Sequence, residues 1–111
     1  MIGMQRVGNK QDWQLLKKRL PGWQEAFMAS RIKEYTKLLS DETKLASDRF
    51  WQLDKMINED RKKSGVIVEL SPSDMDLMLL NLLRVGAITK SDLEGFSEEL
   101  IEVVRYFYKN D

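Results

Sequence analysis

The chain has 111 residues, of which 42% are hydrophobic and 32% charged, and this balance predicts a globular domain, neither disordered nor membrane-embedded. Its 18 basic and 18 acidic residues cancel to a formal net charge of zero. The absence of cysteine and histidine excludes disulfides, thiolate metal sites and histidine acid–base chemistry. Residues 1–10 lack the long apolar core of a signal peptide, so we expect a cytoplasmic protein. Residues 1–8 are expected to be flexible, and residues 9–111 are expected to form a single helical domain.

The charges are distributed unevenly along the chain. Residues 1–63 hold 14 Lys or Arg against 9 Asp or Glu, whereas residues 64–111 hold 4 Lys or Arg against 9 Asp or Glu. The first part therefore has a net positive charge and the second a net negative charge. Solvated helix faces explain such a pattern most simply. The same asymmetry would also favour two copies that dock head to tail.

Two helices are predicted before residue 40. Asn9 can cap a first helix that ends at Leu20, and Pro21-Gly22 is expected to separate it from a second helix. The second helix, residues 23–39, has apolar residues at intervals of three and four: Trp23, Phe27, Met28, Ile32, Tyr35, Leu38 and Leu39. This spacing predicts an amphipathic helix.

A third helix is predicted over residues 44–63. Its apolar seam, which we expect to face the core, steps by four, three and four residues: Ala46, Phe50, Leu53 and Ile57. Gly65 is predicted to adopt the left-handed backbone conformation that often follows the end of a helix. The β-branched run of residues 66–70 then favours an extended segment. It is interpreted first as a linker packed on the core, and second as an edge that pairs with the same segment of another copy.

The densest apolar stretch, residues 71–83, predicts a central helix that is capped by Ser71 and is the most buried element. Thr89 is expected to cap a short helical turn that Gly95 interrupts, and Ser97 to cap the last helix. Together these elements predict an all-α fold. We expect a single compact bundle of about five helices with one short extended segment.

Basic residues gather at two predicted helix ends and form a candidate basic patch: Lys17, Lys18, Arg19, Arg61, Lys62 and Lys63. Cations near a helix C-terminus interact favourably with the helix dipole, which explains them most simply. The alternative is a nucleic-acid-binding regulator that contacts phosphates through these side chains. A helix-turn-helix pattern over residues 79–96 has the wrong charge for that role, because Asp92 and Glu94 outnumber Lys90. Nucleic acid is therefore not expected as a partner.

Glu98, Glu99 and Glu102 share a predicted helix and form a candidate magnesium motif. With Asp74 and Asp76 as a second carboxylate pair, they could serve a nucleotide hydrolase, which is the other alternative. Acidic residues are also favoured in the first turn of any helix, and this explains most of them without a metal. We therefore expect no metal, no cofactor and no catalytic residue.

The candidate interaction surface consists of Trp23, Trp51, Val66 and Val68. Both tryptophans lie near the edge of an apolar stripe, and both valines belong to the extended segment. Aromatic residues are enriched where proteins bind one another, although each of these side chains could also be part of the core.

Three groups of residues carry a resemblance: Phe50-Trp51-Gln52-Leu53, the run from Gly65 to Ser71, and Ile88-Thr89 with Asp92-Leu93 and Phe96-Ser97-Glu98-Glu99-Leu100. The block of residues 50–107 resembles small uncharacterised helical proteins of Gram-positive bacteria and their phages and mobile elements. The resemblance implies an accessory protein that works by binding. With the unpaired extended segment and the charge asymmetry, it leads us to expect a non-catalytic protein-binding module that forms a homodimer.

Overall fold

The computed structural model describes residues 7–109, in which four α-helices and two short 3₁₀-helices occur and no strand is present. The elements are α1 (Lys10–Ser40), α2 (Ala46–Asp60), η1 (Pro72–Asp74), α3 (Met75–Arg84), η2 (Lys90–Leu93) and α4 (Glu98–Lys109). The predicted all-α class is confirmed, with four helices instead of about five. Residues 1–6 of the predicted flexible segment lie outside the described part of the chain. None of the described helices is long and apolar enough to cross a membrane.

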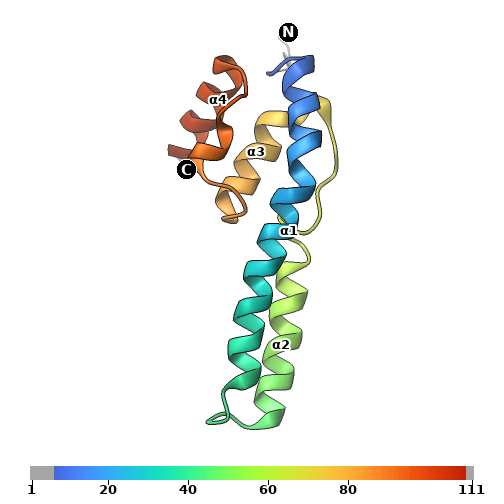
Figure 1. The fold of residues 1–111 in the computed structure, drawn as a ribbon, viewed down its shortest axis with the longest axis vertical. Helices are drawn as coiled ribbons and strands as arrows, with labels where there is room; N and C mark the ends of the chain where they lie inside the picture. Colours follow the sequence, from blue (N-terminus) through green and yellow to red (C-terminus); the bar gives the residue numbers. More distant parts are fainter. Residues whose placement is uncertain (1–6, 110–111) are drawn as a thin grey trace.

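The molecule is elongated along α1. It measures 56 × 26 × 23 Å, and its radius of gyration is 17.1 Å, whereas a compact chain of this length has about 13 Å. Figure 1 shows two parts, a head in which the N-terminal half of α1 lies beside α3 and α4, and an arm in which the C-terminal half of α1 pairs with α2 alone. We define the arm as residues 24–63 and the head as residues 7–23 and 64–109. The predicted compactness of the bundle is not confirmed.

α1 is a continuous helix of 31 residues with Pro21 inside it, so the predicted break at Pro21 is wrong. An interior proline removes a backbone hydrogen bond and costs about 3 kcal/mol. Packing on both sides of the proline offsets this cost, because Leu20 is buried in the head while Phe27 and Leu38 are buried in the arm. Tertiary contacts therefore continue the helix where local propensity predicts its end.

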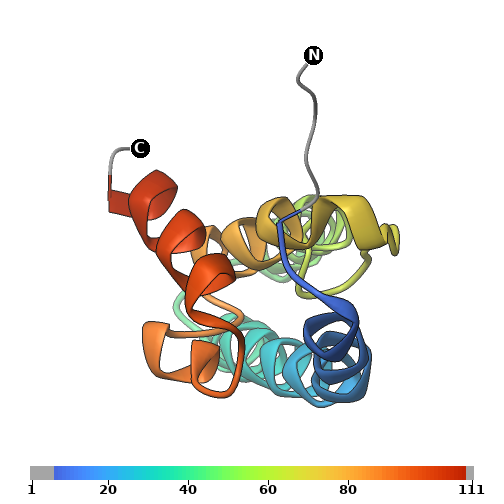
Figure 2. The same cartoon turned by 90° about the horizontal axis from the view of Figure 1, so that it is seen from above.

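α3 contributes the largest share of the hydrophobic cluster of the head, in line with the prediction of a central helix, and Figure 2 shows it along one side of the head with α1 and α4 on the others. Six of its ten residues are buried: Met75, Met78, Leu79, Leu80, Leu82 and Leu83. All of them except Leu80 belong to one hydrophobic cluster with Leu16 of α1 and with Leu100 and Val104 of α4. The start of α3 differs from the prediction, because Ser71 does not cap it. The Ser71 hydroxyl donates to the Asp74 carboxylate at 2.9 Å, and the 3₁₀ turn η1 precedes the helix.

Asp12 joins the beginnings of α1 and α4. It forms the predicted cap of α1 with Asn9, whose backbone N–H donates to Asp12 Oδ2 at 3.0 Å. The same carboxylate accepts the backbone N–H and the hydroxyl of Ser97, at 2.8 and 2.6 Å. Asp12 is only 3% exposed, so it is a buried cross-link between helix ends that lie 85 residues apart in the chain.

The segment between α2 and η1 is irregular and crosses from the arm to the head. Val68 packs partly against the core, whereas Ile67 is 64% exposed, so the segment is a linker with one packed side. α2 ends at Asp60, three residues before the predicted end. Gly65 is not in the left-handed region, contrary to the prediction. Instead, the absence of a side chain at Gly65 lets the ring of Phe27 pack against the backbone, because a Cβ at this position would lie 2.3 Å from that ring.

Candidate protein interface

α2 has a clear apolar seam but buries no hydrophobic side chain; its one buried residue is Asp60. The seam was predicted to face the core, and this prediction is wrong for the single chain. Phe50 is 63% exposed and Ile57 is 38% exposed. The periodic stretch therefore does form a helix, but its apolar side is covered only in part: Leu53 and Met56 are partly buried, whereas Phe50 lies mostly in solvent.

The C-terminal half of α1 carries a second exposed apolar stripe. Phe27 and Leu38 face α2 and are buried, but Ile32 is 58% exposed and Leu39 is 45% exposed. At 100° per residue, Ile32 and Leu39 lie about a quarter-turn from the line of contact with α2. α1 therefore uses one part of its apolar surface within the arm and leaves the adjacent part open.

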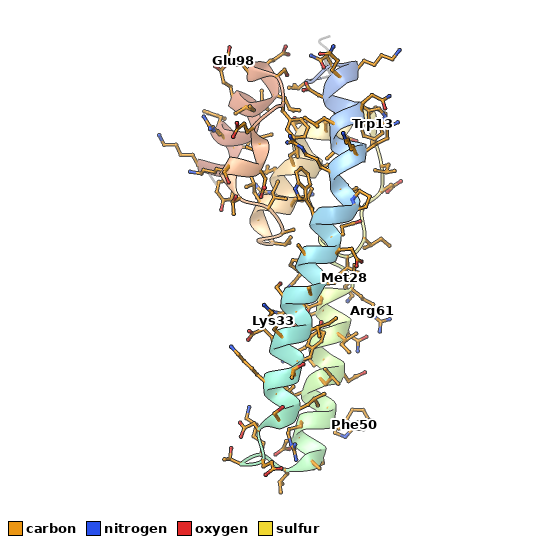
Figure 3. All side chains as sticks on the ribbon, viewed as in Figure 1. Trp13, Met28, Lys33, Phe50, Arg61 and Glu98 are labelled. Atoms are coloured by element: carbon orange, nitrogen blue, oxygen red, sulfur yellow. The ribbon has the colours of Figure 1, made fainter. Side chains whose placement is uncertain are left out.

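The two exposed stripes lie on the same side of the arm. Met28, Ile32 and Ile57 line one groove between α1 and α2, and Figure 3 shows Met28, Phe50 and Arg61 on the right-hand side of the arm. In Figure 1, α3 and α4 lie to the left of α1, and the linker that follows α2 runs along the right-hand side of the N-terminal half of α1. We call this side of the arm the arm face and define it by Met28, Ile32, Leu39, Ala46, Phe50, Leu53 and Ile57. Helical spacing places polar residues on the opposite side: Glu34, Lys37 and Glu59.

A buried carboxylate holds the two helices of the arm together. The Asp60 side chain is 4% exposed; Arg31 Nε lies 2.7 Å and Lys63 Nζ 3.0 Å from its oxygens, and the Tyr35 hydroxyl donates to it as well. Burial by itself raises the pKa of Asp60, but the hydrogen bonds from Tyr35, Arg31 and Lys63 outweigh it and lower this pKa from 3.8 to about 2. Near the other end of the arm, Arg49 Nη1 donates to the carbonyl of Leu39 at 2.6 Å. These bonds fix the spacing of the helices and hence the shape of the arm face.

Asp60→Asn should lower the free energy of unfolding by about 2–4 kcal/mol, because Arg31 and Lys63 would lose their buried anionic partner. The wild type should keep this stabilisation above pH 4 and lose it progressively as the pH falls from about 4 to about 2, since the pKa of Asp60 is 3.8 without the fold and about 2 within it. Urea unfolding at pH 7 and pH 3, at one protein concentration, measures both effects. An equal loss of stability in wild type and variant between these pH values would contradict the role of Asp60.

The four residues of the predicted interaction surface do not form one patch. Trp23 is half-buried against the core of the head. Trp51 is 64% exposed on α2, with its ring centroid 4.9 Å from that of Phe50, so it borders the arm face. Val66 lines the groove at the end of the arm nearest the head, while Val68 packs partly on the core of the head.

The predicted basic patch is divided between the head and the arm: Lys17, Lys18 and Arg19 belong to α1 in the head, and Arg61, Lys62 and Lys63 follow α2 in the arm. Arg19 Nη1 donates to the carbonyls of Asp92 and Glu94 at 3.2 and 2.6 Å. Lys63 is paired with Asp60. Two of the six cations are thus engaged in holding the fold together.

The other two candidate motifs are the acidic residues of the magnesium motif and the helix-turn-helix pattern. Among residues 7–109, no three carboxylates come close enough to hold a metal ion. Glu98 and Glu99 lie in the first turn of α4, where acidic residues are expected. The second helix of the helix-turn-helix pattern is the four-residue 3₁₀ turn η2, in which the predicted cap holds: the Thr89 backbone N–H donates to Asp92 at 2.8 Å.

Comparison with protein-family models, with curated proteins and with solved structures finds no significant match to this chain.

Proposed function

We propose that the protein is a non-catalytic protein-binding module that self-associates by packing its arm face against the arm face of a second copy. The observation that carries this proposal is that α2, a helix of 15 residues, has no fully buried hydrophobic side chain within its own chain; only Leu53 and Met56 are partly buried. Helices in proteins owe most of their stability to the packing of an apolar face. Two arms placed face to face would supply that packing and complete a four-helix bundle.

The size of the arm face suits such a dimer. Ile32, Leu39, Phe50 and Ile57 are 38–63% exposed, and at about 150–200 Å² per side chain they leave roughly 300–400 Å² of apolar surface open. Met28 and Leu53 add to it because they are partly exposed. A standard interface buries about 800 Å² per partner, a little over half of it apolar. The arm face therefore supplies most of the apolar centre of one such interface.

Few charges would have to be desolvated in this contact. By helical spacing, Asp54 and Arg61 border the arm face on α2, and the charged side of the arm is turned away from it. Arg31 and Asp60 also line the groove, but they are paired with each other. Burying an unpaired charge is costly, so a face whose charges are paired or lie at its border is suited to close packing. The resemblance of residues 50–107 supports placing this module among the accessory proteins of phages or mobile elements in Gram-positive bacteria.

Phe50→Glu should convert the dimer into a monomer. The substitution places two carboxylates, one from each copy, in the apolar contact, and we expect the dimer dissociation constant to rise at least 100-fold. Sedimentation equilibrium over a dilution series measures the mass, which should fall from twice 13.0 kDa to 13.0 kDa.

Leu77→Glu is the matched control, because Leu77 is 49% exposed but lies on α3 in the head. It should leave the mass unchanged, and circular dichroism should show the same helix content in both variants. A wild-type mass of 13.0 kDa at every concentration would remove the proposal. Equal dissociation by Leu77→Glu and Phe50→Glu would remove the arm face as its site.

A further inference from the structure

We infer that the two copies pair with their arms antiparallel, so that the acidic tip of each arm lies beside the basic base of the other. The tip is residues 41–45, between α1 and α2, and the base is residues 61–63, where the chain leaves α2. This inference rests on the proposed self-association through the arm face and adds the orientation of the partner. It places the two heads at opposite ends of a rod.

Two symmetric arrangements bury the arm face equally well. A two-fold axis perpendicular to the long axis of the arm gives antiparallel arms, and an axis parallel to it gives parallel arms with adjacent heads. In both arrangements each helix has antiparallel neighbours, so the helix dipoles are equally satisfied. Buried apolar area and helix dipoles therefore do not distinguish the two arrangements, and the charges at the two ends of the arm do.

The charges at the two ends are opposite in sign. The tip holds two carboxylates, Asp41 and Glu42, against one cation, Lys44, so its net charge is negative, and Glu42 is exposed. At the base, Lys63 is committed to Asp60, but Arg61 is exposed and lines the groove of the arm face (Figure 3). Parallel arms would set acidic tip against acidic tip and basic base against basic base. Antiparallel arms replace both repulsions by attractions. Because of the two-fold symmetry, the contact between tip and base occurs at two equivalent places.

The antiparallel arrangement also fixes which apolar residues meet. Within one arm, Arg31 is level with Asp60, and Leu39 is level with Arg49. The middle of the arm consequently falls near Tyr35 on α1. A two-fold axis at this level brings Ile32 beside Leu39 of the second copy, and the same operation brings Phe50 beside Ile57. The most exposed side chains of the arm face would thus be covered by one another.

A distance between two spin labels tests the orientation. The chain contains no cysteine, so Gln14→Cys provides a single labelling site, exposed on α1 in the head and far from the charges of the arm. Gln14 lies 21 residues from the middle of the arm, about 31 Å at 1.5 Å per residue. Antiparallel arms should therefore separate the two labels by about 60 Å. A separation below about 30 Å would show parallel arms and overturn the inference while leaving the proposed function intact, whereas the absence of any intermolecular distance would overturn both.

Charge reversal tests the contact between tip and base. Glu42→Lys and Arg61→Glu should each raise the dimer dissociation constant about tenfold, because an exposed ion pair contributes a few-fold and is replaced by repulsion at two equivalent places. The double variant should return to within about threefold of the wild type. Glu98→Lys, on α4 in the head, is the control with the same change of charge. A tighter dimer with Glu42→Lys, or a double variant weaker than both single variants, would overturn the antiparallel pairing.

Discussion

Leu79→Ala and Leu82→Ala should each lower the free energy of unfolding by about 2–5 kcal/mol, the range for large-to-small changes in a closed core. Both side chains are 0% exposed, and both lie in the hydrophobic cluster in which α3 meets α1 and α4. Loss of either side chain leaves a cavity that three helices border, and a short helix such as α3 cannot fill it by itself. Urea unfolding followed by circular dichroism measures the change.

Leu77→Ala is the control for these two variants. Leu77 belongs to the same helix but is 49% exposed, so its truncation should cost less than about 1 kcal/mol. The comparison separates the effect of burial from the effect of helix propensity, because the same residue type changes in the same helix. Unfolding midpoints that are equal for all three variants would show that α3 is not the centre of the fold.

Asp12→Ala should destabilise the fold by about 3 kcal/mol. The carboxylate is 3% exposed and accepts hydrogen bonds from the backbone N–H of Asn9 and from both the backbone N–H and the hydroxyl of Ser97. Its removal would leave these donors without their partner in the interior, and an unsatisfied buried donor costs about 1–3 kcal/mol. It would also remove one of the two bonds of the capping box of α1, while the bond from the backbone N–H of residue 12 to the Asn9 side chain would remain, and it would remove the tie between α1 and α4.

Asp92→Ala is the matched control for Asp12→Ala. Asp92 accepts the backbone N–H of Thr89 in a capping box of the same type, but its bonds are exposed and stay within η2. We expect a loss of about 1 kcal/mol, the usual value for a cap. Equal losses for the two variants would show that the bonds from Asp12 to Ser97 contribute little.

The all-α class and the position of each apolar stripe were predictable from the sequence because both depend on local chemistry. The intervals of three and four that place Phe50 and Ile57 on one side of a helix are a property of the chain itself. The same holds for the caps at Asn9 and Thr89, where a side chain bonds a backbone group three residues away. Two helices therefore begin where their caps were predicted.

What covers a stripe was decided only by the tertiary structure. Periodicity states that a helix has an apolar side, but it does not state which surface lies against that side. The seam of α2 was consequently predicted to face the core and instead lies open on the arm face. The most useful signal for a partner is this difference between an apolar pattern and its burial, and it appears only when both are known.

The continuity of α1 and the two buried carboxylates also required the tertiary structure. Local propensity predicts an end at Pro21, and burial on both sides of the proline outweighs it. Asp12 and Asp60 read in the sequence as ordinary acidic residues of a helix turn. Their donors Ser97 and Arg31 lie 85 and 29 residues away. A bond between such distant residues has no local signature, because it depends on how whole helices pack against one another.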